Sequence, residues 1–522
     1  MKRREILRAA GAAGLGLAAP GIIQGQSART LTYVPSSDIA SLDPLYLAPG
    51  VSIVYGFMVF DTLYGVDESL NVQPQMVEGH VVENDGKLWR ITLRLGLRFH
   101  DGEPVRARDA VASIRRWAGI DVLGMKLMSL TDELSAPSDR EIVFRLKRPF
   151  PLLPWSLAKP ATYTCFIQPE RLAVAAGSKG PIAEIIGSGP FRYLPDERLA
   201  GSRAVFAKFG QYVPRPEPQR WGAGGKAPYF DRVVWNVIPD PATAVGALQK
   251  GEVDWWELPP VDLVPLIKRD PKLAVTVKDI VGGECGLRFN STIAPFDNPG
   301  VRRAVLTAIK QSDYMQAIAG DNPSVWRDKV GVWSLGKPMS TDAGIEVMAG
   351  DIPKARQMLA DAGYKGETVA ILAPADVPTL YTIAQVCADM LSRIGMKVDL
   401  QTMDYGTMIQ RRTNRGPVDK GGWSMFFVWF DGVNRFDPAS NLGITGTYFG
   451  WPNVPEIDAL REAWFDAPDR VTQRELARQI QLLVWRDVPF IPLGTYYQTT
   501  AYSRSLTGIS RAGVDFSSVR RV

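Results

Sequence analysis

The sequence predicts an α/β protein with more than one domain. Its 522 residues exceed the usual size of a single domain, which is about 100–200 residues. Two segments, 89–95 and 142–146, alternate apolar and polar residues with the period of a half-buried strand. Residues 367–402 follow the order strand, helix, strand, which is typical of a parallel crossover unit.

The first half of the chain supplies the strand-rich part of this prediction. Between the two alternating segments, residues 101–104 predict a turn and residues 109–117 have helical spacing. A stretch rich in proline and glycine at 210–228 predicts a surface loop. We then expect a strand over 232–238 and a helix over 241–250 that ends at Gly251.

The second half predicts a sheet covered by helices. Asn298 caps a helix whose apolar spacing continues to Met315, and Gly320 is expected to end it. A second helix begins after Asp351 and ends at Gly363. The crossover unit consists of strand 367–373, helix 378–394 and strand 396–402. Residues 422–431 are apolar on both faces, which predicts a fully buried strand.

The N-terminus has the pattern of an export signal. A basic segment, 1–8, precedes a mild apolar run, and small residues at 26–28 predict cleavage near Ala28. Arg3-Arg4 resembles a twin-arginine signal, and an ordinary secretory signal is the alternative. No later segment has the length of apolar residues that spans a bilayer. We therefore expect a soluble periplasmic protein with an export signal over 1–28.

Composition and motifs exclude several function classes. The net charge of +5 is concentrated at the N-terminus, so nothing predicts a nucleic-acid partner. His80 and His100 are the two histidines, and neither accompanies a nucleophile motif. No phosphate-binding loop, paired Cys-x-x-Cys or histidine cluster is present, so we expect no cofactor, no metal site and no enzyme activity. Three cysteines allow at most one disulfide.

Two places combine aromatic and polar residues at the end of a strand. Trp255-Trp256-Glu257 ends an expected strand where the chain leaves the sheet. The buried strand 422–431 runs into a polar loop that contains Asp431, Asn434 and Arg435. Ligands of open α/β sheets bind outside the carboxyl ends of strands. The loop at 431–435 is therefore the first place at which we expect a ligand.

An ordered series of short motifs then identifies a family resemblance. Besides the strands and helices described above, the series comprises the segments 41–44, 73–78, 99–104, 187–191, 247–254 and 289–290 with 301–304. In this order they resemble the extracytoplasmic solute-binding proteins of peptide-type ABC importers, family 5, the dipeptide, oligopeptide and nickel class. The resemblance implies a two-lobed periplasmic-binding-protein fold of the cluster C type, with an extra α/β subdomain in lobe one. It also implies a monomer that captures a peptide or peptide-like solute and delivers it to permease subunits.

The resemblance also implies domain boundaries. Lobe one is expected at 29–72, 188–284 and 491–522, the inserted subdomain at 73–187 and lobe two at 285–490. The chain is expected to cross the hinge near 282–289 and again near 489–495.

Finally, the resemblance implies the roles of site residues. Peptide-binding members hold the ligand amine with an aspartate between a tryptophan and an Asp-Pro pair. Here Trp429 and Asp437 bracket Asp431, although the spacing is longer than usual. Asp431 is either this anchor or the cap of a turn, and Arg435 is either a carboxylate ligand or a loop arginine. Apolar walls or core packing are the alternatives for four more residues: Trp423, Phe427, Trp256 and Tyr46.

Other solutes remain open at this point. The same fold accommodates an opine, an oligosaccharide, a nickel chelate or haem. An exported hydrolase such as a glycosidase is a further alternative.

Overall fold

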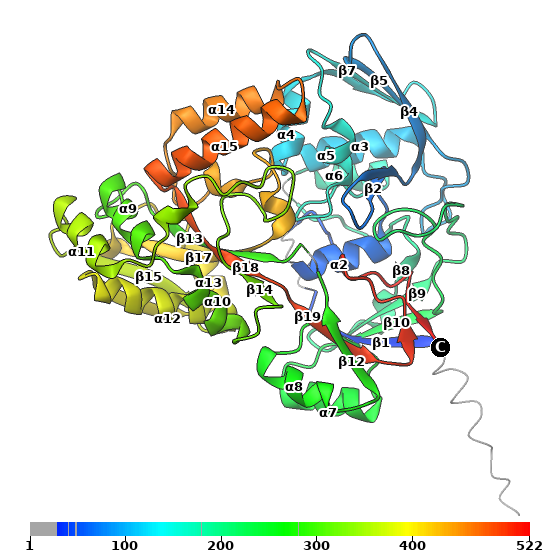
Figure 1. Ribbon diagram of the computed structural model, residues 1–522. Helices are drawn as coiled ribbons and strands as arrows, with labels where there is room; N and C mark the ends of the chain where they lie inside the picture. Colours follow the sequence, from blue (N-terminus) through cyan, green and yellow to red (C-terminus); the bar gives the residue numbers. More distant parts are fainter. Residues whose placement is uncertain (1–28, 40, 47–49, 179, 280) are drawn as a thin grey trace, which may run out of the picture.

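The computed structural model describes residues 29–522 apart from positions 40, 47–49, 179 and 280. The expected export signal and its cleavage near Ala28 lie outside the described residues. Three parts, each with its own large sheet, make up the molecule (Figure 1). Within the part of the chain described, no helix combines the length and the hydropathy that crossing a membrane requires.

The first sheet collects strands from distant parts of the chain. Its seven strands lie in the order β12 (Leu273–Val277), β19 (Thr499–Ser503), β11 (Trp255–Trp256), β1 (Thr30–Val34), β10 (Arg232–Asn236), β9 (Arg203–Lys208) and β8 (Phe191–Tyr193). β1 pairs in parallel with β10 and β11, and the other neighbours are antiparallel. Three helices accompany these strands: α2 (Gly50–Val59), α7 (Pro241–Lys250) and α8 (Val264–Lys268).

The second sheet has six strands. They lie in the order β14 (Trp326–Arg327), β18 (Phe490–Tyr496), β13 (Gly283–Phe289), β17 (Met425–Asp431), β15 (Thr368–Pro374) and β16 (Lys397–Met403). β15 and β16 are parallel and joined by helix α12 (Pro378–Arg393), so the predicted crossover unit is confirmed. The expected buried strand 422–431 is β17, which pairs with β13 along its whole length.

Helices surround this second sheet (Figure 1). They are α9 (Pro299–Ala308), α10 (Gln311–Ala319), α11 (Ile352–Asp361), α13 (Tyr405–Arg411), α14 (Pro455–Phe465) and α15 (Arg470–Asp487). Short 3₁₀ turns also occur, of which η5 (Gly432–Arg435) directly follows β17. The remaining 3₁₀ turns are η1 (Pro195–Glu197), η2 (Val261–Leu263), η3 (Ile345–Val347), η4 (Val418–Lys420) and η6 (Leu442–Ile444).

The single helix expected from Asn298 to Gly320 is wrong, because the chain forms α9 and α10 instead. Ile309 leaves the helical conformation with ψ near 130°, and its carbonyl accepts a hydrogen bond from the Gly350 N–H at 3.0 Å. Ile309 is nevertheless fully buried. The apolar spacing continues through the break, so the spacing alone predicts one helix.

The third part lies between α2 and β8 in the sequence. Its four strands lie in the order β4 (Val77–Glu83), β5 (Leu88–Leu93), β7 (Glu141–Leu146) and β6 (Thr131–Ser135). The helices beside them are α3 (Ala107–Ala118), α4 (Val122–Ser129), α5 (Leu153–Ala158) and α6 (Glu170–Ala176). Two small sheets complete the strands: β2 (Tyr64–Val66) with β3 (Val72–Pro74), and β20 (Leu506–Thr507) with β21 (Arg520–Arg521).

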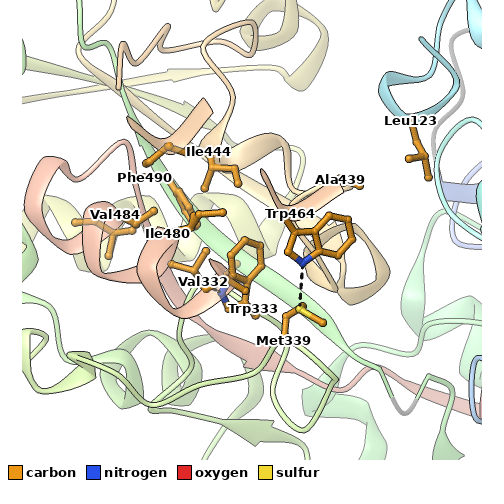
Figure 2. Packing of buried hydrophobic residues seen from close by; sticks show 14 of the residues in the cluster. Leu123, Val332, Trp333, Met339, Ala439, Ile444, Trp464, Ile480, Val484 and Phe490 are labelled. Atoms are coloured by element: carbon orange, nitrogen blue, oxygen red, sulfur yellow. Dashed lines mark hydrogen bonds between the residues drawn. The ribbon is translucent and has the colours of Figure 1, made fainter. Parts of the chain in front are cut away.

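The apolar core of the second sheet reaches the third part. Figure 2 shows Trp333, Trp464 and Met339 packed together, with the Trp464 indole N–H donating to the Met339 sulfur at 3.4 Å. Leu123 of α4 belongs to the same set of buried contacts. The core around α14 and α15 and the core around α4 are therefore in contact.

The three cysteines lie inside these cores as free thiols. Burial raises the pKa of Cys285 and of Cys387 to about 12, and it raises the pKa of Cys165 well above the ordinary range. Buried thiols that stay protonated are poor nucleophiles. The structure therefore assigns them to packing.

His100 joins the third part to the start of β8. Its ring nitrogens lie 3.3 Å from the Gly187 N and 3.0 Å from the Gly189 carbonyl oxygen, and its ring packs on Phe209. Because one nitrogen accepts and the other donates in this arrangement, the neutral form of His100 fits both contacts. Burial lowers its pKa to about 4.

We expect this contact to weaken in acid. A histidine whose pKa is lowered on folding contributes its full stability above about pH 6.5 and loses it as the pH falls through 4. The loss is below about 3 kcal/mol, because the residue is only half-buried and solvent screens part of the effect. Urea midpoints at pH 7 and pH 4.5 should differ more for the wild type than for His100→Gln. Equal differences in the two proteins would contradict this role.

Candidate ligand-binding site

The loop after β17 is held against the chain that enters the second sheet. The Gly432 N–H donates to the Gly282 carbonyl at 2.8 Å. A Cβ on Gly432 would lie 2.6 Å from the Val281 side chain, so only glycine fits there without displacement. The Ser334 hydroxyl donates to the Gly432 carbonyl at 2.7 Å. These contacts fix the backbone where the candidate residue Asp431 ends its strand.

For Asp431, the predicted amine anchor, the structure describes only the position of the backbone. Asp431 pairs with Gly283 in the register of β17 and β13, at the carboxyl end of β17. Its side chain lies outside the described part of the structure. Its role as an amine anchor therefore stays a prediction.

Arg435 lies inside the second part, not on an open loop surface. Its side chain is 2% exposed, and its Nη1 lies 3.6 Å from a carboxylate oxygen of Glu284, which is fully buried. The guanidinium lies over the Phe490 ring at 4.9 Å. A Cβ on Gly286 would come within 2.6 Å of its Nη2. This environment favours a structural role over the expected one as a ligand for a solute carboxylate.

The Glu284–Arg435 pair is poorly satisfied. Burial raises the pKa of Glu284, and the guanidinium of Arg435 opposes that rise only in part. Burial also lowers the pKa of Arg435. Both carboxylate oxygens and Nη1 have no hydrogen bond of normal geometry among the described residues. Each charge is therefore stabilised mainly by its partner in the ion pair and less by hydrogen bonds from neighbouring groups.

Three of the expected apolar walls are core residues. Trp423 is fully buried and its indole N–H donates to the Arg412 carbonyl at 3.1 Å. Phe427 of β17 is also buried and contributes to the large core of the second part, whereas Trp423, which precedes β17, packs with Phe426 in a separate cluster. Trp256 packs with Leu248 in the first part. Of the two roles left open for them, the structure favours packing.

Glu257 is likewise engaged within the protein. Its carboxylate accepts hydrogen bonds from the Lys278 ammonium at 2.8 Å and from the Ser36 N–H at 2.7 Å. Burial alone would raise the pKa of Glu257, but the charge of Lys278 and these hydrogen bonds lower it below the ordinary value. Glu257 thus ties the end of β11 to the chain just before it enters the second sheet.

Trp429, Asn434 and Tyr46 are the other expected site residues. The Trp429 indole lies over the backbone of Gly283, where a Cβ would come within 2.1 Å of Nε1. Its Nε1 is buried and has no hydrogen-bond partner among the described residues. Asn434 is 8% exposed within η5, and Tyr46 is half-buried in the loop before α2. Trp429 and Asn434 lie within three residues of Asp431 in the chain, and no hydrogen bond or ring contact among the described residues joins Tyr46 to them.

An arginine and a row of aromatic rings that lie together beside the second sheet were not predicted from the sequence. Arg412 follows α13, and its guanidinium lies 4.3 Å from the centre of the Phe449 ring. The row continues from Phe449 to Tyr448, whose ring centres are 5.2 Å apart, and from Tyr448 to Phe430, whose ring centres are 5.9 Å apart. The run of aromatic residues at 448–451 was visible in the sequence. Its position beside β17 was not, because sixteen residues or more separate it from that strand's end.

The second and third parts touch through apolar and charged contacts. The rings of Trp155 and Phe436 stack with centres 6.3 Å apart, and those of Phe150 and Phe465 lie 6.1 Å apart. Around them, Lys126 and Arg148 form ion pairs with Glu462 of α14 and with Asp466, the residue that follows this helix. Figure 1 shows α4 beside the end of α14 and α15. The loop that follows β17 is therefore covered by the third part.

Comparison with known proteins identifies the family. The model of bacterial extracellular solute-binding proteins, family 5 (middle), matches residues 71–452. The chain belongs to this family. The predicted family and the role of solute-binding protein are confirmed.

Relatives of this family 5 protein match it over nearly their full length. A probable peptide ABC transporter periplasmic-binding protein, y4tO, of Sinorhizobium fredii is 36% identical over 98% of this chain and 97% of the relative. The glutathione-binding protein GsiB of Pectobacterium atrosepticum is 25% identical over 97% of this chain and 95% of the relative.

Solved structures show the same fold. The periplasmic binding protein DppA of Helicobacter pylori, in complex with the peptide STSA, superposes with a TM-score of 0.79 at 20% identity. The superposition covers 96% of this chain and 99% of DppA. The predicted two-lobed α/β fold is therefore confirmed.

Proposed function

We propose that this family 5 protein captures a peptide or peptide-like solute between its two lobes and delivers it to the permease of an ABC importer. The observation that carries the proposal is the match to y4tO, named as a probable peptide ABC transporter periplasmic-binding protein, along essentially the whole chain. The peptide complex of DppA has the same fold. Binding without turnover fits a family that is named for solute binding.

We also propose where the lobes begin and end. Lobe one is the first sheet with its helices, the third part is its inserted subdomain, and lobe two is the second sheet. β13 starts at Gly283 and β18 ends at Tyr496, and both belong to the second sheet. The crossings are then 278–282 and 497–498. These crossings differ by a few residues from the expected boundaries at 284 and 490. The reason is that β13 and β18 pair with each other, so each whole strand is assigned to lobe two.

The location follows from the same proposal. An export signal over 1–28, twin-arginine or general secretory, would carry the chain to a periplasm, where it would act as a soluble monomer and meet the membrane through its permease. A soluble receptor reaches its permease only if it is retained near the cell, and an outer membrane retains it.

Within the site, Asp431 is proposed to hold the amine of the solute. It ends the buried strand β17 next to Trp429, and the glycine-dependent contacts of the next residue fix its backbone. Asn434 and Trp429 lie beside it in the chain and are proposed to contact the solute. Tyr46 would face the solute from lobe one.

A screen tests both proposals. Melting temperatures are measured with di- and tripeptides, glutathione, opines, oligosaccharides, a nickel chelate and haem, since a true ligand raises the melting temperature. For peptides that raise the melting temperature, binding is then measured by calorimetry, and the solute is analysed chemically after incubation with the protein. We expect stoichiometric binding and an unchanged solute. Altered solute, or stabilisation by another class alone, would refute peptide capture.

For a peptide found in this screen, Asp431→Asn is expected to weaken binding by about 100-fold, because a charge-assisted hydrogen bond to the amine is lost. The matched control is Asp389→Asn, an exposed aspartate on α12 that pairs with Arg393 at 3.8 Å. Calorimetry should show unchanged affinity for the control. Equal affinities of the wild type and Asp431→Asn would leave Asp431 only its alternative role as the cap of a turn.

A further inference from the structure

The third part touches lobe two at a distance from the two segments that connect the lobes. Residues 278–282 and 497–498 carry the chain between the first and second sheets, next to β12 and β19. Figure 1 shows these two strands well apart from the place where α4 meets the ends of α14 and α15. A rotation about connecting segments displaces distant surfaces more than near ones. The contact between α4 and α14 therefore depends strongly on how far the lobes are separated.

This contact has an apolar centre. Phe150 of the third part and Phe465 of α14 lie with their ring centres 6.1 Å apart. Phe150 is 1% exposed and Phe465 is 8% exposed, so both rings are largely withdrawn from water. Nearer the loop after β17, the stacked rings of Trp155 and Phe436 also join the two parts. A buried apolar centre of this kind is typical of the interface between two proteins that associate.

Charges of opposite sign surround the centre, and each sign belongs to one side. The third part supplies the cations Lys126 and Arg148, and lobe two supplies the carboxylates Glu462 and Asp466. Lys126 pairs with Glu462, Arg148 pairs with Asp466, and Arg148 Nη2 also lies 3.6 Å from a carboxylate oxygen of Glu462. The Lys126 ammonium lies 4.7 Å from the centre of the Phe465 ring. Shared partners make these charges a network, which contributes more than isolated surface ion pairs do.

We propose that these four charged residues, here called the clasp, favour the closed arrangement of the lobes before a solute is bound, and thereby raise the affinity for the solute. This role rests on the proposed function, because it assigns the third part and α14 to lobes that move relative to each other. A solute that binds only closed lobes is bound more tightly when a larger fraction of the protein is already closed. The clasp lies outside the loop 431–435, so its members are positioning residues.

Charge reversal tests the clasp in the solute-free protein. Lys126→Glu with Arg148→Glu brings four carboxylates together, and repulsion should then separate the lobes. Small-angle X-ray scattering should show a larger radius of gyration than in the wild type. Adding Glu462→Lys and Asp466→Lys to this variant restores opposite charges with the signs exchanged. The radius of this exchanged variant should return close to the wild-type value, because only the contact of Lys126 with the Phe465 ring is missing.

The matched control reverses two charges whose partners lie within the third part. Arg90 pairs with Glu83 and Glu141 at 3.1 and 3.2 Å, and Arg145 pairs with Glu133 at 3.2 Å. Arg90→Glu with Arg145→Glu changes the net charge by the same amount as the clasp variant and should keep the wild-type radius. An equal increase in the control and the clasp variant would refute the proposal, since net charge would then be the cause.

Salt gives a second measurement on the same proteins. The Debye length falls from about 8 Å at physiological ionic strength to about 3 Å at 1 M, so attraction and repulsion both weaken. The radius of the wild type should therefore increase with salt, whereas the radius of Lys126→Glu with Arg148→Glu should decrease. Changes of the same sign in the two proteins would contradict an electrostatic clasp.

A peptide identified in the screen provides the measurement of affinity. The dissociation constant of Lys126→Glu with Arg148→Glu should be about 10-fold higher than that of the wild type, and the exchanged variant should recover most of the loss. The order of preference among peptides should stay the same, because the clasp acts only on closure. A changed order would contradict a positioning role.

The scattering and binding results distinguish the two proposals. If the radius is the same in the wild type, the charge-reversed variant and the exchanged variant, the clasp is refuted and peptide capture is unaffected. If the radii change as expected and no peptide binds, the clasp is supported as a device for closure and peptide capture fails.

Discussion

Arg435→Ala is expected to lower the free energy of unfolding by about 3–5 kcal/mol, because it leaves the buried carboxylate of Glu284 without its counter-charge. Glu284 is fully buried, so water cannot replace the guanidinium. The stacking of Arg435 on Phe490 is lost as well. Glu284→Ala should have an effect of similar size, since it leaves the buried guanidinium unpaired. Urea midpoints of the two variants and the wild type give the comparison.

The double variant Glu284→Leu with Arg435→Met is the informative control. Because the pair lacks good hydrogen bonds, two apolar side chains of similar size should restore most of the lost stability. The alternative predicted from the sequence, a ligand role for Arg435, gives a different result. In that case Arg435→Ala would remain stable and lose affinity for the solute. Such a result would return Arg435 to the binding site.

The pattern of the apolar residues was sufficient to predict three of the six strands of the second sheet, β15, β16 and β17. Strand, helix and strand at 367–402 became β15, α12 and β16, with the two strands parallel. Residues of β15 are apolar on both faces, α12 and β16 each have one apolar face, and glycine or proline lies at the junctions. The same reasoning failed at Ile309. There, a carbonyl bonded to Gly350 breaks the helix, and a contact between residues so far apart in the sequence leaves no trace in the local pattern.

The strand that leads to the candidate site was predictable from the sequence, but the contacts around its end were not. The buried strand that ends in Asp431 is β17, and its end lies where the loop meets the chain entering lobe two. The orientation of Arg435 depends on Gly286 and Phe490, which come from two other strands. Phe426 and Phe427 lie on opposite faces of β17, Trp423 packs with Phe426, and all three side chains are buried. An aromatic residue near a site is therefore no guide to which face the solute meets.

Asp43→Ala is the second change for which we expect a loss of about 3–5 kcal/mol in the free energy of unfolding. Asp43 lies in the loop before α2 and binds Arg116 of α3 through both carboxylate oxygens, at 3.1 and 2.5 Å. Both side chains are 1% exposed. The pair joins the loop before α2 to α3 of the third part, and this accounts for the motif at 41–44 in structural terms. Urea midpoints again measure the effect.

Unlike the pair in lobe two, this one is fully satisfied. Arg116 also donates to the Gln168 side chain and to the carbonyls of Gly177 and Gly180, at 2.8–2.9 Å, so all five donors are used. Asp43 also accepts the N–H groups of Leu45 and Ile182.

An apolar replacement of both partners, Asp43→Leu with Arg116→Met, would remove the charges and leave these backbone groups without partners. Each such group costs about 1–3 kcal/mol when it is buried. The double variant should therefore stay as unstable as Asp43→Ala, whereas the double variant of Glu284 and Arg435 recovers. Recovery in both cases would mean that charge burial alone sets the cost, and that the satisfied backbone groups around Arg116 contribute nothing.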